Sequence, residues 1–305
     1  MNRRWKRSAR SSPCSKRRPR VYASKGRAVE EWADRWFFGP VGWRVANALR
    51  STPISADVVT LMSLVLGVIA GHLMWYASSR INAWGVALFI VSDILDSADG
   101  QLARLRGTST RMGRILDGLA DTGRFVSLYG HLGARLYVSG WGWGGAVLAF
   151  AALVSHSYQA AVADFIRQAY LHFAVGNGSE LDIPDHSAMP RGASLVTRFS
   201  SWIYGDYIRR QALLFPRTAA LVRALAGRGV PASLQRAWAE RQRWVVSGCA
   251  WIAQNIRFLL LAVTVVPGYP AAYCWIVVGP LNAIMVALIL AHEREPKLHA
   301  PPQLA

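Results

Sequence analysis

Residues 58–77 read VVTLMSLVLGVIAGHLMWYA and carry no charged side chain over twenty positions. A helix of this length reaches about 30 Å, the thickness of the hydrocarbon core of a bilayer, so the stretch predicts a membrane-spanning helix. Further along, the chain holds five more apolar helical segments, two of them uncharged and three interrupted by polar groups. They cover residues 83–94 with a continuation to 106, 115–138, 144–163, 251–266 and 271–291. We therefore expect an all-α integral membrane protein with six transmembrane helices.

The composition agrees with this class and excludes several others. The chain has 305 residues, of which 52% are hydrophobic and 17% charged, whereas soluble domains carry about 25% charged residues. The apolar content also excludes a wholly disordered protein. Three cysteines are too few for a disulfide scaffold, and none of their spacings is that of a zinc finger.

Basic residues are concentrated at the amino-terminal end. The chain has 35 Lys and Arg against 17 Asp and Glu, a formal net charge of +18, and residues 1–29 hold eleven basic residues and no acid. We interpret residues 1–27 as a disordered basic arm that contacts an anionic membrane surface. A nucleic-acid-binding tail is the alternative for such a run, but an apolar body follows it here, so we expect no nucleic-acid partner.

Residues 28–50 mix aromatic and charged side chains. Trp32, Trp36 and Trp43 alternate with acids and arginines, which is typical of an amphipathic helix in the headgroup layer of a membrane. We expect an interfacial helix pair with a break at Gly39-Pro40. A helix in the core of a soluble protein would be equally amphipathic.

The distribution of Lys and Arg beside the apolar segments predicts the orientation in the membrane. The arm, the connection 104–114 (RLRGTSTRMGR) and the long connection 173–248 are basic, and six crossings place them on one side. We expect both termini in the cytoplasm and, in a bacterium, a location in the inner (cytoplasmic) membrane. Residues 28–295 would form the membrane domain, with a cytoplasmic or interfacial insertion at about 173–248, and residues 296–305 a cytoplasmic tail.

Four aspartates occur in the two predicted helices that meet at this basic turn. An antiparallel pair of these helices can direct all four carboxylates toward one another, beside small residues that leave room for a ligand. The shared faces comprise Asp96, Asp99, Gly100 and Ala103 at i, i+3, i+4 and i+7, and Gly113, Asp117 and Asp121 at i, i+4 and i+8.

Clustered carboxylates in a low-dielectric setting need a cation to remain ionised together. Hard oxygen ligands select Mg²⁺, Mn²⁺ or Ca²⁺ over zinc, and two such ions can clamp a displacement at phosphorus. The simpler alternative is a set of helix-terminal acids paired with Arg104, Arg106, Arg111 and Arg114. A divalent-cation transporter that uses the aspartates as its ion site is a further alternative.

The segment from Asp96 to Asp121 fits the pattern D-x2-D-G-x2-A-R-x8-G-x3-D-x3-D at all eight fixed positions. In this motif, and in its predicted helices, the chain resembles the CDP-alcohol phosphotransferase (phosphatidyltransferase) family of membrane enzymes. The resemblance implies transfer of a substituted phosphate, which we expect to be phosphatidyl, from a CDP-alcohol such as CDP-diacylglycerol to an acceptor alcohol, with release of CMP in phospholipid biosynthesis. Transfer between polar partners of the inositol-phosphate type is the alternative within the family.

The resemblance also implies roles for individual residues and a homodimeric assembly. Asp96, Asp99 and Asp117 would hold two Mg²⁺ or Mn²⁺ ions, and Asp121 would complete this site and act as the general base. The residues that match positions contacting the CDP part of the donor are Gly100, Arg104 and Thr110.

Arginines within apolar segments are a second group of candidates, because such a residue needs an anionic partner or a water-filled cavity. Arg257 is the strongest, as a contact for the phosphate of a phosphorylated acceptor. The alternative is a structural ion pair with an acid on another helix, such as Asp164. Arg124 shares the face of Asp121, and Arg135 and Arg167 are weaker candidates.

Overall fold

The computed structural model describes residues 29, 31–108, 110–176, 195–225 and 229–294. The predicted basic arm and carboxy-terminal tail fall outside these residues. Within them all regular structure is helical and no strand occurs, so the predicted all-α membrane fold is confirmed.

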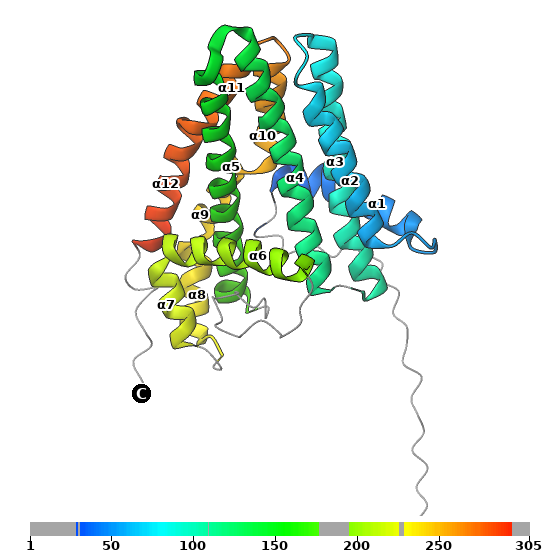
Figure 1. The fold of residues 1–305 in the computed structure, drawn as a ribbon. Coiled ribbons are helices and arrows are strands. Elements are labelled where there is room, and N and C mark those ends of the chain that lie inside the picture. Colours follow the sequence, from blue (N-terminus) through cyan, green and yellow to red (C-terminus); the bar gives the residue numbers. More distant parts are fainter. Residues whose placement is uncertain (1–28, 30, 109, 177–194, 226–228, 295–305) are drawn as a thin grey trace, which may run out of the picture.

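Long helices lie side by side and form the body of the molecule (Figure 1). The side chain of Ser55 accepts a hydrogen bond from the Val58 N–H and so caps the first of them, α2. Gly71 lets α2 approach α4 closely, since a Cβ there would lie 2.8 Å from the Leu128 backbone nitrogen. These helices are α2 (Ala56–Leu73), α3 (Ser79–Arg106), α4 (Arg111–Leu136), α5 (Gly142–Tyr170), α10 (Gln254–Leu260), α11 (Pro270–Val278) and α12 (Pro280–Glu293).

Five stretches of the described chain are long and apolar enough to cross a membrane. One of them, Ile115–Val175, has 61 residues and contains α4, the π-helical turn η2 (Tyr137–Trp141), α5 and η3 (Leu171–Val175). The chain reverses within it at Gly140, where φ is +95°, so that α4 and α5 run back along one another (Figure 1). The number of crossings remains a prediction.

The predicted break at Gly39-Pro40 is wrong. The π-helical turn η1 (Asp34–Phe38) continues directly into α1 (Gly39–Leu49), with Gly39 in the right-handed helical region. Pro40 is the second residue of α1, at the point where the π-helical turn η1 passes into the α-helix. This helix lies across the long helices (Figure 1), and the Arg106 guanidinium donates to the backbone carbonyls that follow it, including those of Leu49 and Thr52.

Two apolar segments that we expected as continuous helices are interrupted. In the fifth, α9 (Arg243–Gly248) and the 3₁₀ turn η4 (Cys249–Ile252) stop at Ala253, whose backbone is extended, before α10 and η5 (Leu261–Val265). The last apolar segment bends between α11 and α12 at Gly279-Pro280, because proline cannot continue the hydrogen bonding of α11.

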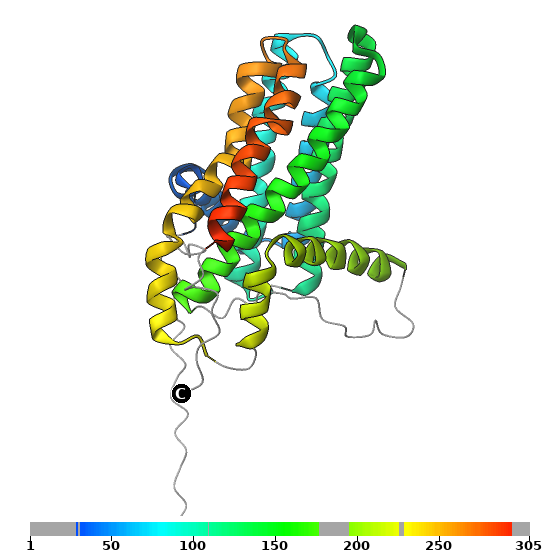
Figure 2. The ribbon, with the colours of Figure 1, turned by 90° about the vertical axis from the view of Figure 1, so that its left-hand side faces the viewer.

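The described part of the insertion forms helices at one end of the bundle (Figure 1). They are α6 (Leu195–Leu214), α7 (Pro216–Ala224) and α8 (Ala232–Arg241). Figure 2 shows α6 lying across the long helices and extending beyond them. Helical structure reaches Val175 at the start of this connection, and a candidate membrane span begins at Arg243. The bounds of the insertion, about 173–248, remain a prediction.

The outer surface is that of a protein in lipid. Large apolar side chains of α2 remain exposed, among them Leu61, Val65 and Ile69. Exposed Trp84 and Trp143 lie near the starts of α3 and α5, as expected of aromatic residues at a membrane interface.

Candidate active site

The turn between α3 and α4 places the predicted aspartates next to each other. Gly107 ends α3 in the left-handed conformation with φ +68°, which glycine adopts without strain. Thr110 then begins α4, its hydroxyl accepting a hydrogen bond from the Gly113 N–H at 3.0 Å. Both helices pack on α2, so their aspartate-bearing faces border a common space.

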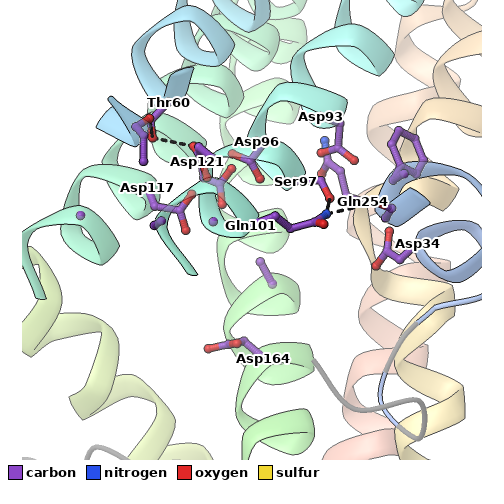
Figure 3. Close-up of a pocket in the computed structure, with 18 of the residues that line it drawn as sticks. Asp34, Thr60, Asp93, Asp96, Ser97, Gln101, Asp117, Asp121, Asp164 and Gln254 are labelled. Carbon is purple, nitrogen blue, oxygen red and sulfur yellow. Dashed lines mark hydrogen bonds between the residues drawn. The ribbon is translucent and has the colours of Figure 1, made fainter. Parts of the chain in front are cut away.

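Three of the four aspartates converge as the sequence predicts. Asp96, Asp99 and Asp117 each offer a carboxylate oxygen, and these oxygens lie within 4.8 Å of one another (Figure 3). The Thr60 hydroxyl on α2 donates to Oδ2 of Asp99 at 2.5 Å and fixes that side chain. The donors are hard carboxylate oxygens on rigid helices, a set that fits Mg²⁺ or Mn²⁺.

The fourth aspartate, Asp121, is not one of that group of three, and an arginine joins it to the group. The Arg124 guanidinium is ion-paired with Asp121, and its Nη2 also donates to Asp96 Oδ1 at 2.8 Å. Its Nη1 donates to the Ser92 hydroxyl at 3.2 Å and lies 4.0 Å from Asp93 Oδ1. Arg124 is 4% exposed, so one buried cation orients three carboxylates.

A glycine on α2 provides the space for this arginine. A Cβ at Gly67 would lie 2.4 Å from both Cγ and Cδ of Arg124 and 3.0 Å from the Ser92 hydroxyl. Any larger residue would therefore displace the guanidinium from Asp96 and Asp121. Gly67 falls in the uncharged run of α2, whose pattern indicates only a membrane helix.

All predicted site residues line one cavity of about 810 Å³ between the helices. A Cβ at Gly100 would approach Nη1 of Arg104 to 3.5 Å, so this glycine leaves the guanidinium accessible from the cavity. Asp57 and Thr60 of α2 also line the cavity, although the sequence pattern did not single them out. The predicted residues that line it are Asp96, Asp99, Gly100, Arg104, Thr110, Asp117, Asp121 and Arg257.

Arg257 forms no salt bridge with Asp164, so the alternative that these two residues make a structural ion pair is wrong. Its Nη2 donates to Gln159 Oε1 at 2.8 Å and to the Ile252 carbonyl at 3.0 Å, a carbonyl that the interruption at Ala253 leaves outside a regular helix. The side chain is 1% exposed, and its Nη1 has no hydrogen-bond partner among the described residues. A buried guanidinium with an unused donor beside a cavity suits an anionic ligand.

A second polar wall of the cavity was missed by the sequence analysis. Glu31, before η1, accepts hydrogen bonds from Arg167 Nη2 at 2.6 Å and from Asn255 Nδ2 at 2.7 Å, and Asn255 also donates to Asp34 Oδ1 at 3.2 Å. Burial raises the pKa of Glu31 above its usual value of 4.5, although Arg167 opposes this. The residues come from three distant parts of the chain, and no local pattern links them.

Two further polar side chains are packed into the bundle, that of the weaker candidate Arg135 and that of His156. Arg135 donates to the Met74 carbonyl at 3.1 Å, next to the α2–α3 connection. His156 is 1% exposed and shares a hydrogen bond with the Tyr129 hydroxyl at 3.0 Å. Arg135 therefore has a structural partner, whereas His156 lies at the edge of the cavity.

Comparison with known proteins agrees with this geometry. Residues 53–173 match the family model described as CDP-alcohol phosphatidyltransferase. This part of the chain is a CDP-alcohol phosphatidyltransferase domain. It contains α2 to α5, and so all four aspartates and the turn that brings them together. Arg257 and most of the insertion lie beyond it.

Curated relatives share part of this domain. A protein of Streptomyces avermitilis named phosphatidylinositol phosphate synthase is 34% identical over 120 residues, 38% of this chain and 46% of the relative. One of the same name from Mycobacteroides abscessus is 31% identical over 117 residues, 36% and 48% of the two chains. A Mycobacterium tuberculosis protein named as a cardiolipin synthase is 37% identical over 65 residues, 21% and 31%. The matches thus span about a third to a half of these relatives.

Proposed function

We propose that this protein transfers a substituted phosphate from a CDP-alcohol, of the CDP-diacylglycerol type, to the hydroxyl of a second alcohol and releases CMP. The observation that carries the proposal is the convergence of Asp96, Asp99 and Asp117 in a cavity lined also by Asp121 and Arg104. The family match of residues 53–173 and the names of the relatives, which are phospholipid synthases, support it.

Asp96, Asp99 and Asp117 would hold two divalent cations, with Asp121 at the edge of this set. Such ions, when bound, neutralise the phosphates of the donor and stabilise the charge that develops during displacement. Thr60 contributes by holding the carboxylate of Asp99 in one orientation.

Asp121 is the residue that we expect to accept the proton of the attacking hydroxyl. The acceptor oxygen forms a bond to the phosphorus that carries the donor's alcohol, the P–O bond to CMP breaks, and CMP departs with the bonding electrons. Arg124 fixes the direction of the Asp121 carboxylate. Arg104 and the space beside Gly100 would receive the leaving nucleotide.

The acceptor that the cavity suits best is a phosphorylated polyol. Arg257 is buried, borders the cavity and has an unused Nη1–H donor, the arrangement expected for binding a phosphate. The two relatives named phosphatidylinositol phosphate synthase support an acceptor of this class.

The location and assembly are also part of the proposal. Exposed apolar side chains on the long helices support an integral membrane protein, and the basic connections support a site that faces the cytoplasm, with both termini on that side. We further expect a basic arm at residues 1–27, a membrane domain at 28–295 and a homodimer.

The decisive test is a reaction of the purified protein with radiolabelled CDP-diacylglycerol and a panel of acceptors in detergent micelles. The panel would contain serine, glycerol 3-phosphate, inositol and inositol 1-phosphate. We expect CMP and one new phospholipid, formed fastest from a phosphorylated acceptor. If divalent cations cross the membrane of reconstituted vesicles while no acceptor releases CMP, the aspartates form a transport site instead.

The role of Arg257 has its own test. Removing a charge-assisted hydrogen bond costs about 1.5–3 kcal/mol, so Arg257→Ala should raise the KM of a phosphorylated acceptor by at least tenfold and leave the donor KM unchanged. Arg135→Gln, which removes a buried arginine with a backbone partner away from the cavity, serves as the control. An unchanged acceptor KM in Arg257→Ala would contradict the assignment.

A further inference from the structure

The helix α5 uses two adjacent faces for two different purposes. His156, Ala160, Ala163 and Arg167 border the cavity, whereas Ser157, Ala161 and Gln168 lie on the neighbouring face. An α-helix turns about 100° per residue, which places Asp164 at the boundary between the two faces. Asp164 lines the cavity and also contacts the insertion helix α6.

The contact between α6 and α5 includes three hydrogen bonds. The Tyr207 hydroxyl donates to Asp164 Oδ2 at 2.7 Å, and Gln211 Nε2 donates to the Ala161 carbonyl at 3.0 Å. One turn nearer the amino-terminal end of α5, the Ser157 hydroxyl accepts a hydrogen bond from Arg210 Nη1 at 3.2 Å. These three contacts are one helical turn apart on α5, so they align α6 along that face.

The carboxylate of Asp164 has neutral partners on one of its two oxygens. Oδ2 accepts from Tyr207 and from Gln168 Nε2, each at 2.7 Å. Among the described residues neither a salt bridge nor a hydrogen bond to Oδ1 is present, and the neighbouring Arg167 is bound to Glu31. Figure 3 shows Asp164 on a different helix from the converging aspartates. It therefore retains an acceptor oxygen for a ligand in the cavity.

We propose that Asp164 binds a hydroxyl group of the acceptor alcohol, and that Tyr207 of the insertion is the positioning residue for its carboxylate. The inference rests on the proposed function. In-line displacement requires the acceptor to approach opposite the leaving CMP. Gly100, Arg104 and Thr110 of α3 and α4 are the donor-side candidates, which leaves the wall of α5 and α10, with Asp164 and Arg257, for the acceptor.

This arrangement gives the insertion a part in the reaction. Tyr207 holds Oδ2, so Oδ1 is directed at a fixed angle, and the acceptor hydroxyl donates to it while a second hydroxyl reacts near Asp121. An acceptor with several hydroxyls is recognised at Asp164 and at Arg257 together. Movement of α6 would change the affinity for the acceptor without touching the donor.

Steady-state kinetics of CMP release test the inference, with the preferred acceptor of the wild-type enzyme and CDP-diacylglycerol varied separately. We expect Asp164→Asn to raise the acceptor KM about tenfold or more, since hydrogen bonds to a charged group are strong. Tyr207→Phe should raise it several-fold, with donor KM and kcat within about twofold of wild type. Arg210→Met is the matched control, because it removes an α6–α5 contact that does not reach Asp164.

The outcomes separate the alternatives. If Tyr207→Phe and Arg210→Met act equally, the effect is general docking of α6, and the positioning role is wrong. If Asp164→Asn raises the donor KM, or changes neither KM while the thermal unfolding midpoint falls, Asp164 is only an anchor for α6. If Asp164→Asn fails to fold, Asp164→Glu takes its place. If Tyr207→Phe fails to fold, Gln168→Leu takes its place, because it removes the other donor to Asp164 Oδ2. Absence of CMP release from the wild type would instead refute the proposed function.

Discussion

Gly67→Ala tests the idea that Arg124 organises the catalytic carboxylates, with a change that removes no charged group. The new Cβ would lie 2.4 Å from Cγ and Cδ of Arg124, whereas ordinary contacts begin at 3.4 Å, so the stem must move by 3.4 − 2.4 = 1.0 Å or more. Cγ and Cδ are the aliphatic atoms that carry the guanidinium group. When they move, the guanidinium moves with them and withdraws from Asp96 and Asp121.

The expected loss follows from the sensitivity of catalysis to position. A displacement of about 1 Å at a catalytic group can reduce the rate about 100-fold. At about 1.36 kcal/mol for each factor of ten, this corresponds to about 2.7 kcal/mol of transition-state stabilisation. We expect kcat/KM for CMP release to fall by roughly that factor, with donor binding largely retained, because the atoms nearest a Cβ at Gly67 belong to Arg124 and Ser92 and not to Gly100 or Arg104.

The assay compares Gly67→Ala with Gly130→Ala, measured for CMP release and for thermal unfolding in the same detergent. Gly130 lies in α4 at an exposed position where a Cβ would meet nothing within 4 Å, so its variant should keep wild-type activity. If Gly67→Ala is folded and retains more than a third of the wild-type kcat/KM, the position of Arg124 does not control the reaction, and the role given to it here is wrong.

Three further predictions concern the acids and the metal. Asp121→Asn should abolish transfer but largely preserve binding of CDP-diacylglycerol measured by equilibrium dialysis; equal loss of both would make it only a ligand. EDTA should stop CMP release and excess Mg²⁺ or Mn²⁺ should restore it, whereas full activity in chelator refutes a metal-dependent reaction. Because burial raises the folded-state pKa of Glu31, the folded state binds this proton more tightly than the unfolded state. The unfolding free energy of the wild type relative to Glu31→Gln should therefore fall as pH increases from about 4.5 through the raised pKa, as measured by denaturant titration; a pH-independent difference would argue against a buried carboxyl.

The aspartate site could be predicted because its geometry is local. Asp96 and Asp99 are one turn apart on one helix, Asp117 is four residues before Asp121 on the next, and Gly107 and Thr110 specify the turn between the helices. Helical periodicity and a short connection are enough to bring these groups together. The clean apolar runs predicted membrane helices for the same reason, since length and charge are properties of a single segment.

Partners from distant segments could not be predicted in this way. The pairing of Glu31 with Arg167 and Asn255 joins parts of the chain separated by 136 and 224 positions, and only the packed structure shows it. The break at Ala253 was missed because the segment Trp251–Val266 contains no proline or glycine, the residues that usually mark the end of a helix. The opposite error occurred at Gly39-Pro40, where residues that often end a helix stand in its first turn.

The charges around Arg124 give an independent reason to expect two divalent ions. If the four motif aspartates and Asp93 are ionised they carry −5, and Arg124, which pairs with Asp96 and Asp121, supplies +1, so this group of six residues carries −5 + 1 = −4. Uncompensated charge inside a membrane protein raises the free energy of the folded state. Lysine or further arginine side chains beside Asp96, Asp99 and Asp117 could balance this charge, but they would fill the cavity that the substrates need. Two divalent cations supply +4 in a small volume and leave the cavity open. In the proposed function, the buried arginine would orient the carboxylate that we expect to act as the base, and two divalent ions would offset the remaining negative charge.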